Sequence, residues 1–152
     1  MRIGAPSAKR VIFGHGLGDT PHGWADVCNM WSKELPDVEF ILPQAPTRPV
    51  TLNMGMQMPA WYDLPKLEDI TSRLDVQAEG IDSAEETYQS LIENPAKTIL
   101  AGFSQGAALA LYTGLRWTAA GKEPLLGIMA LSGYVPAARR IFEDIIHYRP
   151  KC

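Results

Sequence analysis

The sequence predicts an α/β domain built on a mostly parallel sheet with helices on both faces. Short apolar runs alternate along the chain with segments in which apolar residues recur at helical spacing. The apolar runs are continuous, and do not alternate with polar residues, which is typical of strands buried on both faces. Strands that alternate with helices in this way form parallel sheets, because each helix returns the chain to the starting edge.

The first predicted strand covers residues 10–13 and leads into a glycine-rich loop, Gly14-His15-Gly16. A helix follows, in which apolar residues recur at helical spacing before a closing proline: Trp24, Val27, Trp31, Leu35 and Pro36. Residues 38–42 form a second short apolar run, which predicts another buried strand. Pro43 ends it, since proline cannot donate a hydrogen bond within a central strand.

Prolines recur from Pro43 to Pro65 and exclude a long helix, so residues 44–69 are predicted to be irregular. The segment is too rich in methionine and aromatic side chains to be a disordered linker. We expect it to pack over another part of the domain.

The second half repeats the order of strand and helix. Helical spacing over residues 81–92 predicts a helix, and residues 98–101 predict the strand after it. An amphipathic helix is predicted over residues 107–121, followed by a buried strand over residues 125–131. There is no internal repeat and no low-complexity segment that would mark a domain boundary.

The pentapeptide Gly102-Phe103-Ser104-Gln105-Gly106 lies between the strand at 98–101 and the next helix. A Gly-x-Ser-x-Gly motif in that context is typical of a nucleophile elbow, where the serine occupies a strained turn and its hydroxyl projects from the sheet. The two glycines remove Cβ atoms where strand and helix approach most closely. Ser104 is therefore the predicted nucleophile, and it needs a base beside it.

Attack by a serine creates an oxyanion that preorganised N–H donors must stabilise. In an elbow one donor is the backbone N–H of the residue after the serine, here Gln105, and the second comes from a loop after an earlier strand. The loop His15-Gly16-Leu17-Gly18 is the predicted source, because its glycines let the backbone approach the reacting carbonyl. We assign this second donor to Leu17. For the His15 side chain we expect a loop-bracing role.

The proline-rich segment also contains a group of methionine and tryptophan side chains with two alternative interpretations. As an adaptable apolar wall, the group would bind a flexible acyl chain. Alternatively, the same side chains only fill the core. The residues assigned to substrate binding are Met54, Met56, Met58 and Trp61.

Composition excludes several other classes of protein. A hydrophobic content of 46% with 20% charged residues predicts a globular, soluble domain. The net charge of −3 argues against nucleic acid or an anionic membrane surface as the main partner. No apolar stretch predicts a transmembrane segment, and the first ten residues do not resemble a signal peptide. The two cysteines form no disulfide framework, which favours the cytosol or nucleus. No metal or cofactor site is expected, since no ligand spacing or phosphate-cradling loop occurs.

Four stretches together are far more specific than the elbow alone. They are residues 11–20 with Gly23-Trp24, residues 43–53, residues 58–63 and residues 102–106. From about Arg10 to Tyr134 the chain resembles the phospholipase/carboxylesterase family of α/β-hydrolases, in particular eukaryotic acyl-protein thioesterases. The resemblance implies hydrolysis of thioesters or esters of long acyl chains, such as palmitoylated proteins or lysophospholipids. It also implies an acyl-enzyme on Ser104, with the oxyanion held by Leu17 and Gln105.

The same resemblance implies two further strands, with the aspartate and histidine of a catalytic triad in the loops after them. Nothing after Tyr134 corresponds to these elements. We therefore expect an incomplete α/β-hydrolase domain over residues 1–136, which lacks the last strands, and a divergent tail over residues 137–152. Asp144 and His147 can contact each other on one helical face, but we do not expect them to reach the elbow.

We expect the tail to be amphipathic and to cover part of an exposed sheet edge with four apolar residues: Ile141, Phe142, Ile145 and Ile146. Two functional hypotheses follow. The chain is a serine hydrolase by descent, or it is a catalytically inert homologue that only binds acyl chains. The activity of these 152 residues is left open, because loss of the base of a serine triad costs about 10⁶ in rate.

Overall fold

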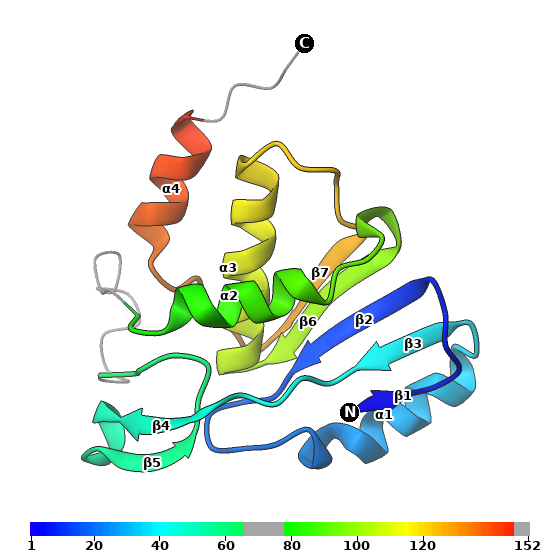
Figure 1. Ribbon diagram of the computed structural model, residues 1–152, viewed down its shortest axis with the longest axis horizontal. Helices are drawn as coiled ribbons and strands as arrows, with labels where there is room; N and C mark the ends of the chain where they lie inside the picture. Colours follow the sequence, from blue (N-terminus) through cyan, green and yellow to red (C-terminus); the bar gives the residue numbers. More distant parts are fainter. Residues whose placement is uncertain (66–77, 148–152) are drawn as a thin grey trace.

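The computed structural model describes residues 1–65 and 78–147, in which one central sheet carries helices on both faces (Figure 1). The helices and strands, in chain order, are β1 (Arg2–Ile3), β2 (Lys9–Gly14), α1 (His22–Glu34), β3 (Val38–Ile41), β4 (Thr47–Val50), β5 (Met56–Pro59), α2 (Ile81–Ser90), β6 (Thr98–Phe103), α3 (Gln105–Ala119), β7 (Gly127–Leu131) and α4 (Ala138–His147). Short 3-10 turns occupy Thr51–Asn53 and Pro95–Lys97.

The central sheet has the strand order β1-β3-β2-β6-β7. β3, β2, β6 and β7 run parallel, and only the short β1 is antiparallel to its neighbour. The structure confirms the predicted mostly parallel sheet. The register pairs Gly14 with Gly102, so β2 and β6 end side by side. This alignment brings the glycine-rich loop after β2 next to the elbow after β6.

Residues of the buried strands alternate between two hydrophobic clusters, one on each face of the sheet. Val11 and Phe13 of β2 point to the cluster that contains Cys28 of α1. Ile12, between them, points to the opposite cluster, which contains Tyr88 of α2. Figure 1 shows α1 on one side of the sheet and α3 on the other. Strands buried on both faces explain why the apolar runs are continuous in the sequence.

The segment predicted to be irregular contains a hairpin, and that prediction was wrong for its first half. β4 and β5 pair antiparallel, with Pro49 opposite Gln57. A separate two-stranded sheet tolerates Pro49 because both strands are edge strands. The chain reverses at Met54 and Gly55, whose φ values are 55° and 78°. The part of the prediction that concerns residues 66–69 lies outside the described residues.

The tail forms a helix, α4, but it does not cover the sheet edge as expected. Ile141 is buried in the cluster that α2 and α3 share, whereas the other three apolar residues of the tail are exposed. Arg116 of α3 donates through Nε to Asp144 Oδ2 at 2.8 Å, which holds α4 against α3. Within the described residues, β7 is therefore an edge strand of the central sheet.

None of the helices in residues 1–65 and 78–147 has the length and apolar character that crossing a membrane requires.

Candidate active site

The turn between β6 and α3 holds Ser104 in a backbone conformation that residues other than glycine rarely adopt. Its φ is 52° and its ψ is −114°. Two backbone hydrogen bonds keep this geometry: Ser104 N–H donates to Leu131 O at 2.9 Å, and Ser104 O accepts from Ala108 N–H at 2.9 Å. Strained backbone of this kind costs about 1–3 kcal/mol and is concentrated at functional sites. The predicted order of strand, turn and helix is therefore present.

Glycines permit the close approach of strand and helix at this turn. A Cβ atom at Gly106 would lie 2.2 Å from the carbonyl oxygen of Gly14 at the end of β2. A Cβ atom at Gly102 would lie 2.3 Å from the carbonyl carbon of Gly106. Both distances are shorter than real Cβ contacts, so neither position accepts a larger residue without a backbone shift. The expected reason for both glycines is confirmed.

The backbone N–H groups of Leu17 and Gln105 are among those near Ser104 that have no acceptor within the described residues. Gln105 is the first residue of α3, where backbone N–H groups lack intrahelical partners and the helix dipole is positive. Leu17 lies in the loop that adjoins the elbow, since a Cβ atom at Gly16 would lie 3.6 Å from Ser104 Cβ. Both N–H groups can therefore donate to an anionic oxygen.

The loop that contains Leu17 is held at both ends. Asp19 N–H donates to Gly16 O at 3.2 Å, which closes a turn, and Gly18 adopts a φ of 76°. Gly18 N–H donates to Pro59 O at 2.8 Å, which joins the loop to the end of β5. A positive φ at the third position is what a type II turn requires, and glycine adopts it without strain.

His15 is buried, with an exposed fraction of 1%, and braces this loop as expected. Its Nε2 accepts from Ala45 N–H at 3.1 Å, so the ring proton is on Nδ1, which donates to Gly16 O at 2.8 Å. Burial lowers the pKa of His15, which favours this neutral form. Because both ring nitrogens are engaged, His15 does not serve as a base for Ser104.

Trp61 was predicted to contact substrate, but its side chain is 1% exposed and belongs to the core. Its indole Nε1 donates to His15 O at 2.9 Å, and its backbone N–H donates to Gln105 Oε1 at 2.9 Å. The Gln105 side chain completes the link, since its Nε2 donates to Tyr62 O at 2.8 Å. No pattern in the sequence indicated this side-chain role for Gln105.

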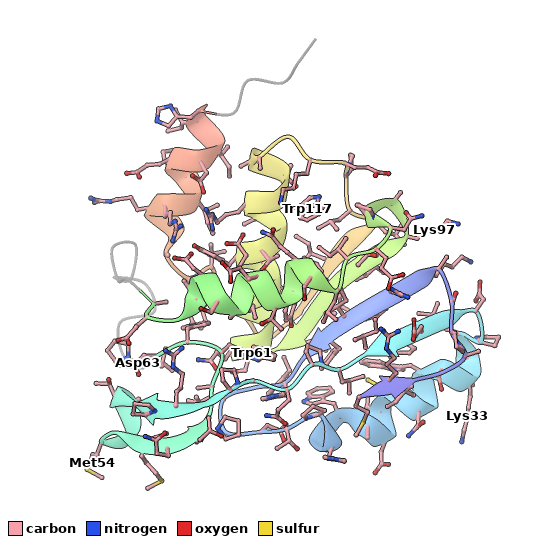
Figure 2. The ribbon with its side chains drawn as sticks, viewed as in Figure 1. Lys33, Met54, Trp61, Asp63, Lys97 and Trp117 are labelled. Carbon is pink, nitrogen blue, oxygen red and sulfur yellow. The ribbon has the colours of Figure 1, made fainter. Side chains whose placement is uncertain are left out.

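The three methionines of the predicted acyl-binding wall occupy different environments. Met54 and Met56 are 96% and 62% exposed, and Met54 lies at the outer end of the hairpin, far from Trp61 (Figure 2). Met58 is partly buried and lies beside the loop, because its Sδ would be 3.7 Å from a Cβ atom at Gly18. Of the three, Met58 is therefore the one placed next to the loop that carries Leu17.

No side chain of residues 1–65 or 78–147 hydrogen-bonds to the Ser104 hydroxyl. Asp144 is bound to Arg116, which lies three helical turns beyond Ser104, roughly 18 Å along α3. Asp144 and His147 line a cleft at this far end of the helix. The structure thus agrees with the expectation that this pair does not reach the elbow.

Comparison with known proteins agrees with this arrangement. The model of the phospholipase/carboxylesterase family matches residues 3–150. The chain is 39% identical over 147 residues to acyl-protein thioesterase 1 of Gibberella zeae, which covers 90% of this chain and 60% of that protein. It is 41% identical over 136 residues to the Neurospora crassa protein of the same name, covering 82% of this chain and 54% of the relative.

Solved structures give the same result. The crystal structure of Zea mays acyl-protein thioesterase 2 aligns with a TM-score of 0.77 and 30% identity, over 94% of this chain and 64% of that one. The crystal structure of Arabidopsis thaliana SOBER1 aligns with a TM-score of 0.74 and 28% identity, over 92% and 68% of the two chains. The chain spans just over half of the length of the curated relatives it matches. It belongs to the phospholipase/carboxylesterase family.

Proposed function

We propose that this chain carries the nucleophile and the oxyanion hole of a serine acyl hydrolase of the acyl-protein thioesterase type. The observation that supports this most directly is the strained Ser104, which lies beside two backbone N–H groups without acceptors. Strain and unpaired donors both cost stability, and both are useful when a serine attacks a carbonyl group.

The proposed reaction has two steps. Ser104 Oγ attacks the acyl carbonyl carbon and transfers its proton to a base, and the N–H groups of Leu17 and Gln105 stabilise the oxyanion. The intermediate collapses with loss of the thiol or alcohol, leaving an acyl-Ser104 ester that water then hydrolyses. Each donor contributes a factor of about 10² to 10³ in rate. The described residues supply these donors but no base, whose loss costs about 10⁶ in rate.

The proposed substrates are thioesters or esters of long acyl chains, such as palmitoylated proteins or lysophospholipids, in the cytoplasm. Two curated relatives are named acyl-protein thioesterase 1, which supports a thioester of an acylated protein. The position of Met58 beside Gly18 makes it our first candidate for contact with the acyl chain. Met54 and Met56 would extend this apolar surface along the hairpin.

Formation of the acyl-enzyme tests this function in the chain as it stands. The protein is incubated with p-nitrophenyl octanoate and with an octanoyl thioester, and its mass is measured with time. After prolonged incubation with excess substrate we expect one octanoyl group on Ser104 in the wild type, formed slowly because the described residues supply no base. Ser104→Ala should lack this adduct, whereas Ser90→Ala, which alters an exposed serine at the end of α2, should keep it. Octanoyl binding without any adduct would contradict the proposal and favour an acyl-binding protein.

A further inference from the structure

The peptide between Gly16 and Leu17 is held from its carbonyl side. Gly16 O accepts from His15 Nδ1 at 2.8 Å and from Asp19 N–H at 3.2 Å. The peptide is trans, so the N–H of Leu17 points away from that carbonyl. Whatever binds Gly16 O therefore also sets the direction of the Leu17 N–H group.

Gly16 allows the plane of the Gly16–Leu17 peptide to flip easily. Without a Cβ atom, Gly16 has access to far more backbone conformations than other residues. A reversed peptide would point its carbonyl oxygen, in place of the N–H, to the opposite side. Gly16 adjoins the nucleophile, because a Cβ atom at Gly16 would be 3.6 Å from Ser104 Cβ and 3.7 Å from Phe103 O. A specific brace is therefore needed to keep the donor in place.

The His15 ring is fixed well enough to be that brace. Nε2 accepts from Ala45 N–H at 3.1 Å, and the Gln44 side chain approaches the same nitrogen at 3.4 Å. The ring packs against Trp61 with 5.2 Å between centroids, and Trp61 Nε1 also holds the His15 carbonyl at 2.9 Å. An acceptor role at Nε2 leaves the proton on Nδ1, so the packing selects the tautomer that can donate to Gly16.

We propose that His15 is a positioning residue of the oxyanion hole: its Nδ1–H holds the Gly16–Leu17 peptide so that the Leu17 N–H faces Ser104. The inference rests on the proposed function, since the direction of this N–H matters only when a carbonyl is attacked there. His15 itself touches neither the nucleophile nor the substrate. It acts through Gly16, in the neutral form that its surroundings impose.

Two substitutions separate this role from simple packing. In His15→Asn the amide nitrogen takes the place of Nδ1 and can donate to Gly16 O, but nothing remains to accept from Ala45. In His15→Gln the amide oxygen reaches the place of Nε2 and can accept from Ala45, but the donor to Gly16 is lost. Both variants lose the ring and its contact with Trp61, so each is the matched control of the other.

The first measurement is the rate at which a fluorophosphonate probe modifies Ser104. We expect His15→Asn to keep most of the maximal inactivation rate and His15→Gln to lose about 10²-fold, the effect of one oxyanion donor. The probe concentration at half-maximal rate should stay the same in both. Equal losses in the two variants, or a wild-type rate in His15→Gln, would overturn the inference.

The second measurement does not depend on reactivity. Nitrogen-15 NMR of the wild type should show His15 protonated at Nδ1, and the opposite tautomer would overturn the inference even if neither variant folds. In His15→Gln the Leu17 and Asp19 amide signals should broaden or double, while in His15→Asn they stay single. Absence of any probe adduct on wild-type Ser104, together with these NMR results, would count against the proposed function and leave the brace intact.

Discussion

The side chain of Gln105 joins the elbow to the segment after β5, and its removal should be costly. It is 2% exposed, and it accepts from Trp61 N–H at 2.9 Å while donating to Tyr62 O at 2.8 Å. Gln105→Ala leaves the buried N–H of Trp61 without its acceptor and removes the donor to Tyr62 O. A buried N–H without a partner costs about 1–3 kcal/mol and the lost hydrogen bond to Tyr62 O about 0.5–1.5 kcal/mol, which gives about 1.5–4.5 kcal/mol in all. Because domains are stable by only about 5–15 kcal/mol, this loss is large.

Urea denaturation, followed by tryptophan fluorescence, measures this loss as a lower midpoint at an unchanged slope. Gln89→Ala is the matched control, since Gln89 lies on a helix, is partly exposed and hydrogen-bonds to Glu85 at 3.0 Å. We expect the control to lose less, because Gln89 is partly exposed and the Glu85 carboxylate keeps its ion pair with Arg116. If Gln105→Ala and Gln89→Ala lost the same free energy, the structural role of Gln105 would be refuted.

Three further outcomes are expected. Gly106→Ala should lower the free energy of unfolding by about 1–3 kcal/mol or more, because its Cβ atom would lie 2.2 Å from the β2 backbone. The control Gly127→Ala, whose Cβ atom would have nothing within 4 Å, should be neutral. The urea midpoints of the two variants are compared. Burial lowers the pKa of His15 in the folded protein, so below about pH 6.5 the unfolded chain binds more protons than the folded one. The wild type should therefore lose more stability on acidification than His15→Asn does. Equal losses of stability between about pH 7.5 and about pH 5.5 would count against this. Arg116→Ala should release α4 and leave the buried Glu85 carboxylate of α2 without its ion pair. Trypsin should therefore cut α4 faster than in the control Lys122→Ala. Equal cleavage rates would argue against a role of Arg116 in holding α4.

The parts of the fold that the sequence predicted depend on local patterns. Continuous apolar runs identify β2 and β6 because both faces of the sheet are covered. The elbow glycines were predictable because the close approach of strand and helix excludes a Cβ atom at Gly102 and Gly106. The bracing role of His15 followed from its place in a glycine-rich loop. Each of these properties depends on a few residues that are neighbours in the sequence.

The hairpin of β4 and β5 was missed because its strands have little buried surface. Only Val50 among the eight paired residues is fully buried, so no apolar run marks either strand. Prolines correctly excluded a helix there, but they also suggested an irregular chain. The turn at Gly55 was the available signal, and it becomes clear only once the two extended segments are paired.

Trp61 and the tail show what pattern alone does not determine. The apolar character of Trp61 is compatible with burial or with a binding wall. Its hydrogen bonds to Gln105 and His15, which lie 44 and 46 positions away, hold it in the core. The tail is amphipathic, but its docking surface was set by Arg116, which lies 28 positions before Asp144. Partners at such sequence separation become known only when the fold is assembled.

Labelling with a fluorophosphonate, followed by peptide mapping, tests most directly whether Ser104 is the nucleophile. We expect one phosphonyl adduct on the peptide that contains Ser104, formed slowly because no base contacts its hydroxyl within the described residues. The adduct should be absent from Ser104→Ala. An adduct on another residue, or none on Ser104 after prolonged exposure of the folded protein, would contradict the assignment.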